Sequence, residues 1–261
     1  MICLSKNGKD EFVNAFAKGT NSKVVTDLDF TTTEPVVFRS IAKRELIQYR
    51  LANNLPFYYI DSGYFGNYKS DINREGKKLW HRIVKNGLQH SNIITRSSDR
   101  FDKLKIKIRD FNKQTGDSVL LALPSSKPCK FYGIDIEEWK EQVITEIRKY
   151  TDRPIIVREK PKLREDRVNS SIYEDLENAY VLVTFNSIAA VESVLYGVPA
   201  ITLAPTAADP VCDKSISKIE SLTNQETDKI YDWACHLAYG QFHYQELLNG
   251  EAWRILKNES C

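Results

Sequence analysis

The chain of 261 residues is predicted to be an α/β protein built on parallel sheets. Short apolar runs rich in β-branched and aromatic residues alternate along it with longer segments of helical periodicity. Parallel strands need long crossover connections, so this alternation indicates β-α-β units. The expected strands lie in SKVVTDL, EPVVFRS, LPFYYIDSG, SVLLALPSS, RPIIVREKP, YVLVTF and PAITLAP.

The clearest helix is expected over residues 135–150, where Trp139, Val143 and Ile147 recur at helical spacing behind an acidic first turn. A second helix is expected over residues 42–53, between two of the strands. Beyond Pro205 the pattern turns helical again. The segments concerned are SISKIESL, TDKIYDWACHLAYG and HYQELLNGEAWRIL.

Domain organisation follows from the polar segment 110–118, DFNKQTGDS, which separates two β-α-β halves and is the expected boundary. The predicted domains are residues 1–115 and 116–235. A helical segment, 236–261, is expected to pack back on the first domain.

Composition indicates a soluble, cytoplasmic protein, because no apolar run reaches the length of a membrane span and the first residues lack the features of a signal peptide. The five cysteines are scattered without a Cys-x-x-Cys pair, so reduced thiols are expected. The four histidines have no metal-binding spacing, and no metal site is expected.

Charge is unevenly distributed along the chain. Residues 1–115 hold 21 Lys and Arg against 12 Asp and Glu, whereas the remainder holds 16 against 23. Most of the positive excess lies between Lys69 and Lys113. This stretch is either a solvated basic face or a surface that attracts a polyanion.

A polar pair, Asn186-Ser187, stands where the strand YVLVTF ends and an apolar helix begins. Either residue can cap that helix. The same geometry can bind a phosphate, because helix N-termini at the carboxyl ends of parallel strands offer free N–H groups. Glu192 lies more than one turn into this helix and must be solvated or hydrogen-bonded there, for example by a ribose diol. Gly197 is expected to end the helix.

The pattern VTFNSIAAVESVLYGVPAI resembles the donor half of GT-B glycosyltransferases, especially the capsule-polysaccharide and Kdo-transferase type. The resemblance implies a GT-B-like fold, with two Rossmann-like parallel-sheet domains, an interdomain cleft and C-terminal helices. It also implies that Asn186 and Ser187 contact the phosphates of the donor, a UDP- or CMP-linked sugar, and that Glu192 contacts the nucleoside. A Walker A loop is absent, and no cofactor or metal beyond the sugar nucleotide is implied.

Basic residues after the next strand extend this resemblance. Arg158 and Lys160 in RPIIVREKPK are similar to the basic strand end that faces the donor diphosphate in such enzymes, although with Glu159 they also form an ordinary surface cluster. Ser125 and Ser126, which follow SVLLAL, could line the same site.

In the first half, Asp61 ends the strand FYYID before a glycine-containing loop. It looks like the acidic-residue loop of the Kdo-transferase type, where the acid is the base that deprotonates the acceptor. An Asx turn explains the same residue without catalysis. His90 is a rival base. The residues expected to bind the acceptor are Tyr64, Lys69, Arg82, Lys85 and His90.

The C-terminal segment LAYGQFHYQELLNGEAW is similar to bacteriophage proteins with this pattern. Enzymes related to them in function place sugars on modified bases of phage DNA. With the basic first half, this favours DNA over a cell-surface glycan as acceptor. The short first half departs from full-size enzymes. A sugar-nucleotide 2-epimerase and a non-catalytic module that binds nucleotide or nucleic acid remain open alternatives. Oligomeric state is not predicted.

Overall fold

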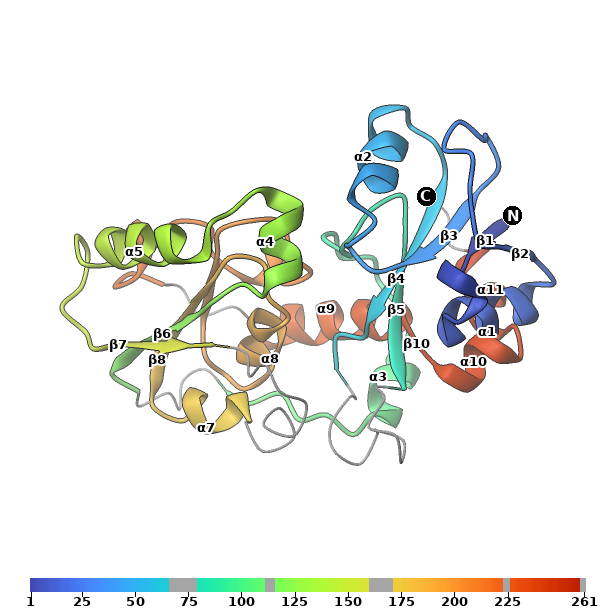
Figure 1. The fold of residues 1–261 in the computed structure, drawn as a ribbon. Coiled ribbons are helices and arrows are strands. Elements are labelled where there is room, and N and C mark those ends of the chain that lie inside the picture. The colour runs from blue at the N-terminus through green and yellow to red at the C-terminus, as the bar shows by residue number, and fades with distance from the viewer. Residues whose placement is uncertain (66–78, 111–115, 160–170, 223–225, 259–261) are drawn as a thin grey trace. The chain divides into compact units, whose positions relative to one another are not determined.

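The computed structural model describes residues 1–65, 79–110, 116–159, 171–222 and 226–258 (Figure 1). The chain forms two compact units, the first from Met1–His90 and Leu237–Cys261 and the second from Ser91–His236. The boundary therefore falls after His90, whereas the sequence placed it within residues 110–118, of which 111–115 lie outside the described residues. The difference arises because the described residues 91–110 belong to the second unit and not to the first.

The first unit is built on a six-stranded sheet. Its strands, in spatial order, are β2 (Lys23–Val25), β1 (Ile2–Leu4), β3 (Val36–Arg39), β4 (Phe57–Ser62), β5 (Trp80–Lys85) and β10 (Gln241–His243). The strands β1 to β4 are parallel, as predicted. However, β5 is antiparallel to β4, and β10 is antiparallel to β5. The sheet is thus mixed, with the expected parallel strands on one side and two antiparallel strands at the other edge.

Three helices cover one face of this sheet: α1 (Glu11–Thr20), α10 (Tyr244–Leu248) and α11 (Glu251–Leu256) (Figure 1). Phe12 and Phe16 of α1 are buried with Ile60, Ile83 and Phe242 of the strands. Tyr58 and Ile60 recur in this cluster at the two-residue spacing of a strand face, and Phe12 and Phe16 recur at helical spacing on α1, which is the pattern of a sheet packed against helices.

The helix expected over 42–53 is α2 (Arg44–Ala52), between β3 and β4. It carries Arg50, whose side chain is fully buried and donates to the carbonyl oxygens of Thr32, Glu34 and Pro56 at 3.2, 2.8 and 2.8 Å. A buried guanidinium needs such acceptors to offset its loss of water. Arg50 therefore ties the helix to the segments on either side of β3.

The C-terminal residues return to the first unit through α9 (Thr227–Tyr239), which is followed by β10, α10 and α11. Trp253 of α11 packs edge-on against Phe16 and Tyr58, at centroid distances of 6.3 and 5.7 Å. Trp233 of α9 is fully buried in the second unit, and its indole N–H donates to the Ala207 carbonyl at 2.7 Å. Both tryptophans anchor apolar helix faces.

The second unit is built on a four-stranded parallel sheet. Its strands, in spatial order, are β7 (Ile155–Arg158), β6 (Ser118–Ala122), β8 (Ala179–Thr184) and β9 (Ala200–Thr202). The predicted strands SVLLAL, PIIVR, YVLVTF and AITL are confirmed. β6 and β8 each have a neighbouring strand on both sides and are largely buried along their length, so their apolar runs are continuous rather than alternating.

The second unit also contains the helices α3 (Asp99–Lys103), α4 (Ser126–Tyr132), α5 (Ile136–Ile147), α7 (Ile172–Leu176) and α8 (Ala189–Leu195), with short 3-10 turns at Asp209–Val211 and Ile216–Lys218. The predicted helix 135–150 is α5, and Asp135 caps it by accepting from the N–H groups of Glu137 and Glu138, each at 3.0 Å.

Among the described residues, no helix is long and apolar enough to cross a membrane. The cysteines Cys3, Cys129, Cys212 and Cys235 are free thiols.

Candidate functional site

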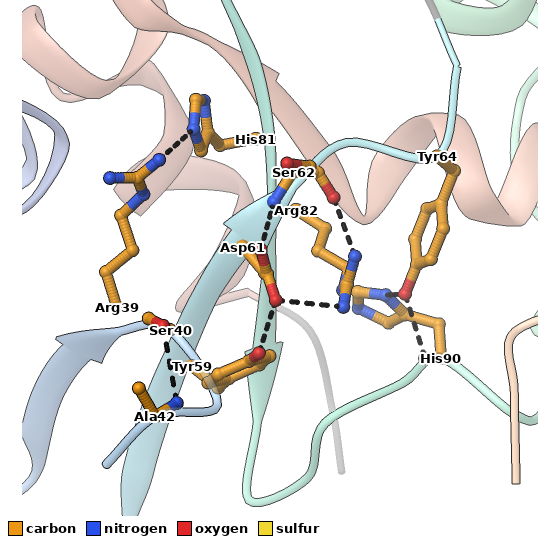
Figure 2. A network of polar contacts seen from close by, with 10 residues as sticks. All are labelled: Arg39, Ser40, Ala42, Tyr59, Asp61, Ser62, Tyr64, His81, Arg82 and His90. Carbon is orange, nitrogen blue, oxygen red and sulfur yellow. Dashed lines mark hydrogen bonds and ion pairs between the residues drawn. The ribbon is translucent and has the colours of Figure 1, made fainter. Parts of the chain in front are cut away.

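A polar cluster in the first unit lies where β4 ends (Figure 2). Asp61 is the penultimate residue of β4 and pairs with Arg82 of the antiparallel β5. Directly paired residues point to the same face of a sheet, so the carboxylate and the guanidinium meet. Tyr59 lies two residues earlier on β4 and therefore points to the same face as Asp61.

The Asp61 carboxylate is hydrogen-bonded on both oxygens (Figure 2). The Tyr59 hydroxyl donates to Oδ2 and the Ser62 backbone N–H donates to Oδ1 at 2.8 Å. Arg82 Nη2 lies 3.5 Å from Oδ2, and Arg82 Nη1 donates to the Ser62 carbonyl at 2.7 Å. The Ser62 contact is the Asx-type geometry that the sequence allows, so Asp61 combines local capping with a charge pair.

Burial raises the pKa of Asp61, but Arg82 and the hydrogen bonds from Tyr59 and Ser62 outweigh burial and lower it below the ordinary value. Burial and the negative charge of Asp61 raise the pKa of Tyr59, so this hydroxyl stays a donor. Asp61 nevertheless keeps 32% of its side chain exposed, against 6% for Arg82. The site is therefore an ionised, accessible carboxylate supported from within by a buried cation.

A second layer of this cluster joins Tyr64 to His90. The Tyr64 hydroxyl lies 2.9 Å from His90 Nδ1 and accepts from the His90 backbone N–H at 3.1 Å. The Arg82 guanidinium lies over the Tyr64 ring, 5.4 Å from its centroid. Burial raises the pKa of Tyr64 to about 12. Tyr64, Arg82 and His90 are thus brought together with Asp61, but Tyr64 and Arg82 are buried and support it from inside.

Lys85 does not join this cluster. It pairs with Tyr58 at the opposite end of β5, and its odd spacing from Arg82 puts it on the other face of the sheet. Lys69 lies outside the described residues. Of the residues expected to bind the acceptor, Tyr64, Arg82 and His90 therefore lie in the Asp61 cluster. Lys85 lies on the other face of the sheet.

Arg39 and His81 form a further pair that the sequence did not predict. Arg39 Nη2 lies 3.4 Å from His81 Nε2 (Figure 2). The Arg39 guanidinium also lies 4.8 Å from the Phe12 ring centroid and 3.7 Å from Asp10. Its positive charge contributes to the lowered pKa of Asp61. The only sequence signal was positional, because Arg39 ends β3 as Asp61 nearly ends β4.

In the second unit, the predicted donor residues gather at the carboxyl ends of β6 and β8. The chain passes from β6 to β7 on one side and then to β8 on the other, so the loops after β6 and β8 diverge. Such a divergence is where open α/β sheets bind ligands. Ser125 and Ser126 follow β6 and are exposed, and Asn186 and Ser187 follow β8 and are half-buried.

Ser187 has a capping role. Its hydroxyl accepts from the Ala189 N–H at 3.2 Å, while α8 itself begins at Ala189 behind Ile188. The cap thus lies one residue outside the expected position. Asn186 instead turns to α4, where its side chain hydrogen-bonds Tyr132 and partly offsets the rise in the Tyr132 pKa that burial causes. The Tyr132 ring also packs edge-on against Phe185 at 5.2 Å.

Glu192 is half-buried on α8, whose other described side chains are buried. Gly197 ends this helix as predicted, with φ +83°. The Gly197 N–H donates to Val194 and the Val198 N–H donates to Ser193, which together form a Schellman motif. The motif sends the chain directly into β9.

Arg158 is the last residue of β7 and forms an ion pair with Asp175 of α7. Its side chain is only 18% exposed. The positive charge expected to face a diphosphate is therefore held by a carboxylate within the second unit. Lys160, its predicted partner in that role, lies outside the described residues.

Comparison with known proteins gives a similarity of fold. No protein-family model and no curated protein sequence matches the chain. Among solved structures, the beta Kdo 2,4 transferase part of Thermosulfurimonas dismutans KpsC matches with a TM-score of 0.56 at 12% identity, over 93% of this chain and 91% of that one. The beta Kdo 2,7 transferase part of the same protein matches with a TM-score of 0.56 at 10% identity, over 98% of both chains. The α/β fold with Rossmann-like parallel strands is shared with these transferases.

Proposed function

We propose that this chain is a glycosyltransferase that uses a sugar nucleotide as donor. The observation that carries the proposal is the similarity of fold over nearly the whole length of two Kdo transferases. Fold alone does not determine activity, and the arrangement of polar residues must agree with it. The two strand-end sites described above supply that agreement.

The donor is assigned to the second unit, at the diverging loops after β6 and β8. Ser125, Ser126, Asn186 and Ser187 lie there, and hydroxyl and amide groups suit phosphate and sugar oxygens. Glu192 is half-buried on the helix that follows and can accept from a ribose diol. Arg158 contributes to the diphosphate site only if its ion pair with Asp175 opens. A UDP- or CMP-linked sugar is the proposed donor class.

Asp61 is the proposed base for the acceptor. An ionised, accessible carboxylate can take the proton of an acceptor hydroxyl as that oxygen bonds to the anomeric carbon and the bond from this carbon to the nucleotide phosphate breaks. The lowered pKa keeps Asp61 ionised at neutral pH. Tyr59 and Arg82 hold its orientation, which lets the carboxylate present one defined lone pair.

The acceptor class that we favour is a glycan hydroxyl. The neighbours in fold are Kdo transferases, and Arg82, which the sequence assigned to binding a polyanion, is buried against Asp61 and Tyr64. A hydroxylated base in phage DNA is the second candidate. The observation in its favour is the excess of Lys and Arg in residues 1–115. A titration of duplex DNA binding against salt distinguishes the two, because absence of binding at low ionic strength removes the DNA version.

The donor is identified by a thermal-shift screen with a panel of sugar nucleotides, since a ligand that binds only the native state raises the melting temperature. Turnover of the stabilising donor is then compared in Asp61→Asn and in Asp27→Asn, a matched control at an exposed aspartate of the same unit. Loss of a general base lowers kcat by about a hundredfold or more. We expect that loss in Asp61→Asn with donor affinity unchanged, and turnover within about twofold of the parent in Asp27→Asn.

Other outcomes point to other functions. Unchanged turnover in Asp61→Asn removes Asp61 as the base. Conversion of the sugar nucleotide in the absence of any acceptor indicates a 2-epimerase. No stabilisation by any member of a broad panel contradicts the glycosyltransferase proposal and favours a module that binds without catalysis.

A further inference from the structure

The strands β1 and β3 form a second point of divergence, in the first unit. β1 is bordered by β2 on one side and β3 on the other, and both pairings are parallel. The chain leaves the carboxyl end of β1 toward β2 and later returns on the opposite side as β3. The loops that follow β1 and β3 therefore separate, which leaves room for a ligand outside their carboxyl ends.

Cationic side chains gather at these two loops. Lys6 follows β1 after a single residue, Arg39 is the last residue of β3, and Lys43 directly precedes α2. Lys43 is half-buried, whereas Lys6 is exposed. Burial and the positive charge of Lys6 lower the pKa of Lys43, and Asp10 only partly opposes them. Because β1 and β3 are paired parallel neighbours, the two lysines follow adjacent strand ends.

Asp10 is the acidic residue of this cluster, and it already has partners. Asp10 accepts from the Val13 N–H at 3.2 Å, at the start of α1, and lies 3.7 Å from Arg39. Within the described ranges, no carboxylate forms an ion pair with Lys6 or Lys43. A small anion between these two ammonium groups would relieve their repulsion and gain charge-assisted hydrogen bonds.

The backbone of both loops is held in an unusual conformation. Asn7 has φ +56° and Ser40 has φ +81°, both in the left-handed region that non-glycine residues rarely adopt. The Ser40 hydroxyl accepts from the Ala42 N–H at 3.3 Å (Figure 2). The buried Ser5 hydroxyl accepts from the Asp10 N–H at 3.0 Å. Strain of this kind persists where surrounding contacts impose it and is common at binding sites. The two loops are thereby kept in position without a ligand.

We propose that Lys6, Lys43 and Arg39 form a subsite at the carboxyl ends of β1 and β3 for one small anionic group, a carboxylate or a phosphate. The subsite lies in the same unit as Asp61 and shares Arg39 with its electrostatic surroundings. It goes beyond the proposed function, because it binds its anion whether or not Asp61 acts as a base. If the transferase proposal is also correct, the acceptor carries that anionic group.

The test is binding of inorganic phosphate to the full chain, measured by isothermal titration and by melting temperature against sodium chloride of equal ionic strength. We expect phosphate to raise the melting temperature more than chloride does. Lys43→Met should weaken phosphate affinity by about tenfold or more, as expected for loss of one charge-assisted hydrogen bond. Lys18→Met, at an exposed lysine in the last turn of α1, removes the same charge and should change the affinity by less than about twofold.

Lys43→Met should also melt at a slightly higher temperature than the parent when no phosphate is present, because the mutation removes a repulsion. Lys6→Met gives a second variant at an exposed position. Equal stabilisation by phosphate and chloride, or equal phosphate affinity in Lys43→Met and Lys18→Met, overturns the proposal. Glycerol phosphate and glucuronate, tested as further probes, distinguish a phosphate ester from a sugar carboxylate. These outcomes do not depend on turnover, so this inference and the proposed function can fail separately.

Discussion

The Arg82 guanidinium lies 3.5 Å from the Asp61 carboxylate and is almost completely buried, whereas about a third of Asp61 is exposed. The pair therefore has one end inside the protein and one end at its surface. Removal of the outer charge leaves a buried cation with the Ser62 carbonyl as acceptor. Removal of the inner charge leaves a carboxylate that water can still reach. The two changes should have different effects on stability and on pH dependence.

Arg82→Met should raise the pKa of Asp61, because the charge that opposes burial is lost. The folded-state pKa of Asp61 in the parent is lowered from 3.8, so its contribution to stability is present above pH 4 and is lost as pH falls below that value. Arg82→Met should lose less stability than the parent between pH 4 and pH 2. A carboxyl-carbon NMR titration and urea unfolding at several pH values measure the two effects.

The control is Arg254→Met, at an exposed arginine of α11. It should retain the acid sensitivity of the parent. If Arg82→Met loses stability with acid as steeply as the parent does, Arg82 is not the group that keeps Asp61 ionised.

Gly240→Ala should destabilise the first unit. A Cβ at this position would lie 2.5 Å from His90 Cε1, so the imidazole must move and its contact with Tyr64 must break. Overpacking of this kind costs about 1–3 kcal/mol, measured as a change in the free energy of unfolding in urea. Gly87→Ala, in the loop that leads to His90, meets only ordinary contacts at 3.5 Å or more and should be neutral or slightly stabilising. Equal effects of the two substitutions would contradict the close approach.

Arg50→Lys should destabilise the first unit although the charge is kept. One ammonium cannot reproduce the fork with which Arg50 reaches the carbonyls of Thr32, Glu34 and Pro56. Hydrogen bonds from charged donors contribute about 1.5–3 kcal/mol each, so loss of one lowers the free energy of unfolding by about that amount. Arg254→Lys is the matched control and should change it by less than about 0.5 kcal/mol. A small effect of Arg50→Lys in urea unfolding would mean that water replaces the missing contacts.

Ser187→Ala separates the two explanations of the Asn186-Ser187 pair. Loss of the hydrogen bond from the Ala189 N–H should lower the free energy of unfolding by about 1 kcal/mol. Ser126→Ala, at an exposed serine that makes no described cap, should have little effect on stability. Donor affinity is measured in parallel. A stability loss with unchanged donor affinity would mean that Ser187 serves only as a cap.

The elements found from the sequence are those with a strong local pattern. The parallel strands of the second unit are continuous apolar runs, and α5 has both its periodicity and its Asp135 cap in the sequence. β1 and β10, of three residues each, were not among the expected strands. β5 was hidden in a stretch of basic residues, because the partners that let Arg82 be buried, Asp61 and the Ser62 carbonyl, lie far away in sequence. Its direction also depends on that pairing.

The same distinction holds for the sites. Asp61, Asn186 and Ser187 could be found because each follows an apolar strand, and strand ends are where parallel sheets bind ligands. The support of Asp61 by Tyr59 and Arg82 could not be predicted, since it requires the register of β4 against β5. The cluster of Lys6, Arg39 and Lys43 likewise requires that β1 and β3 be neighbours. Residue type and position identify candidates, but pairing decides their charge and accessibility.

The position of β10 at the far edge of the first sheet has a consequence for synthesis of the chain. Gln241–His243 pairs with Trp80–Lys85, yet the ribosome makes it only after the whole of the second unit. Until then the nascent chain presents β5 as an open strand edge, and α10 and α11 do not yet cover Phe16 and Ile83. The first unit therefore starts to fold first and finishes last, and chains that stop before residue 241 should depend on chaperones to avoid aggregation.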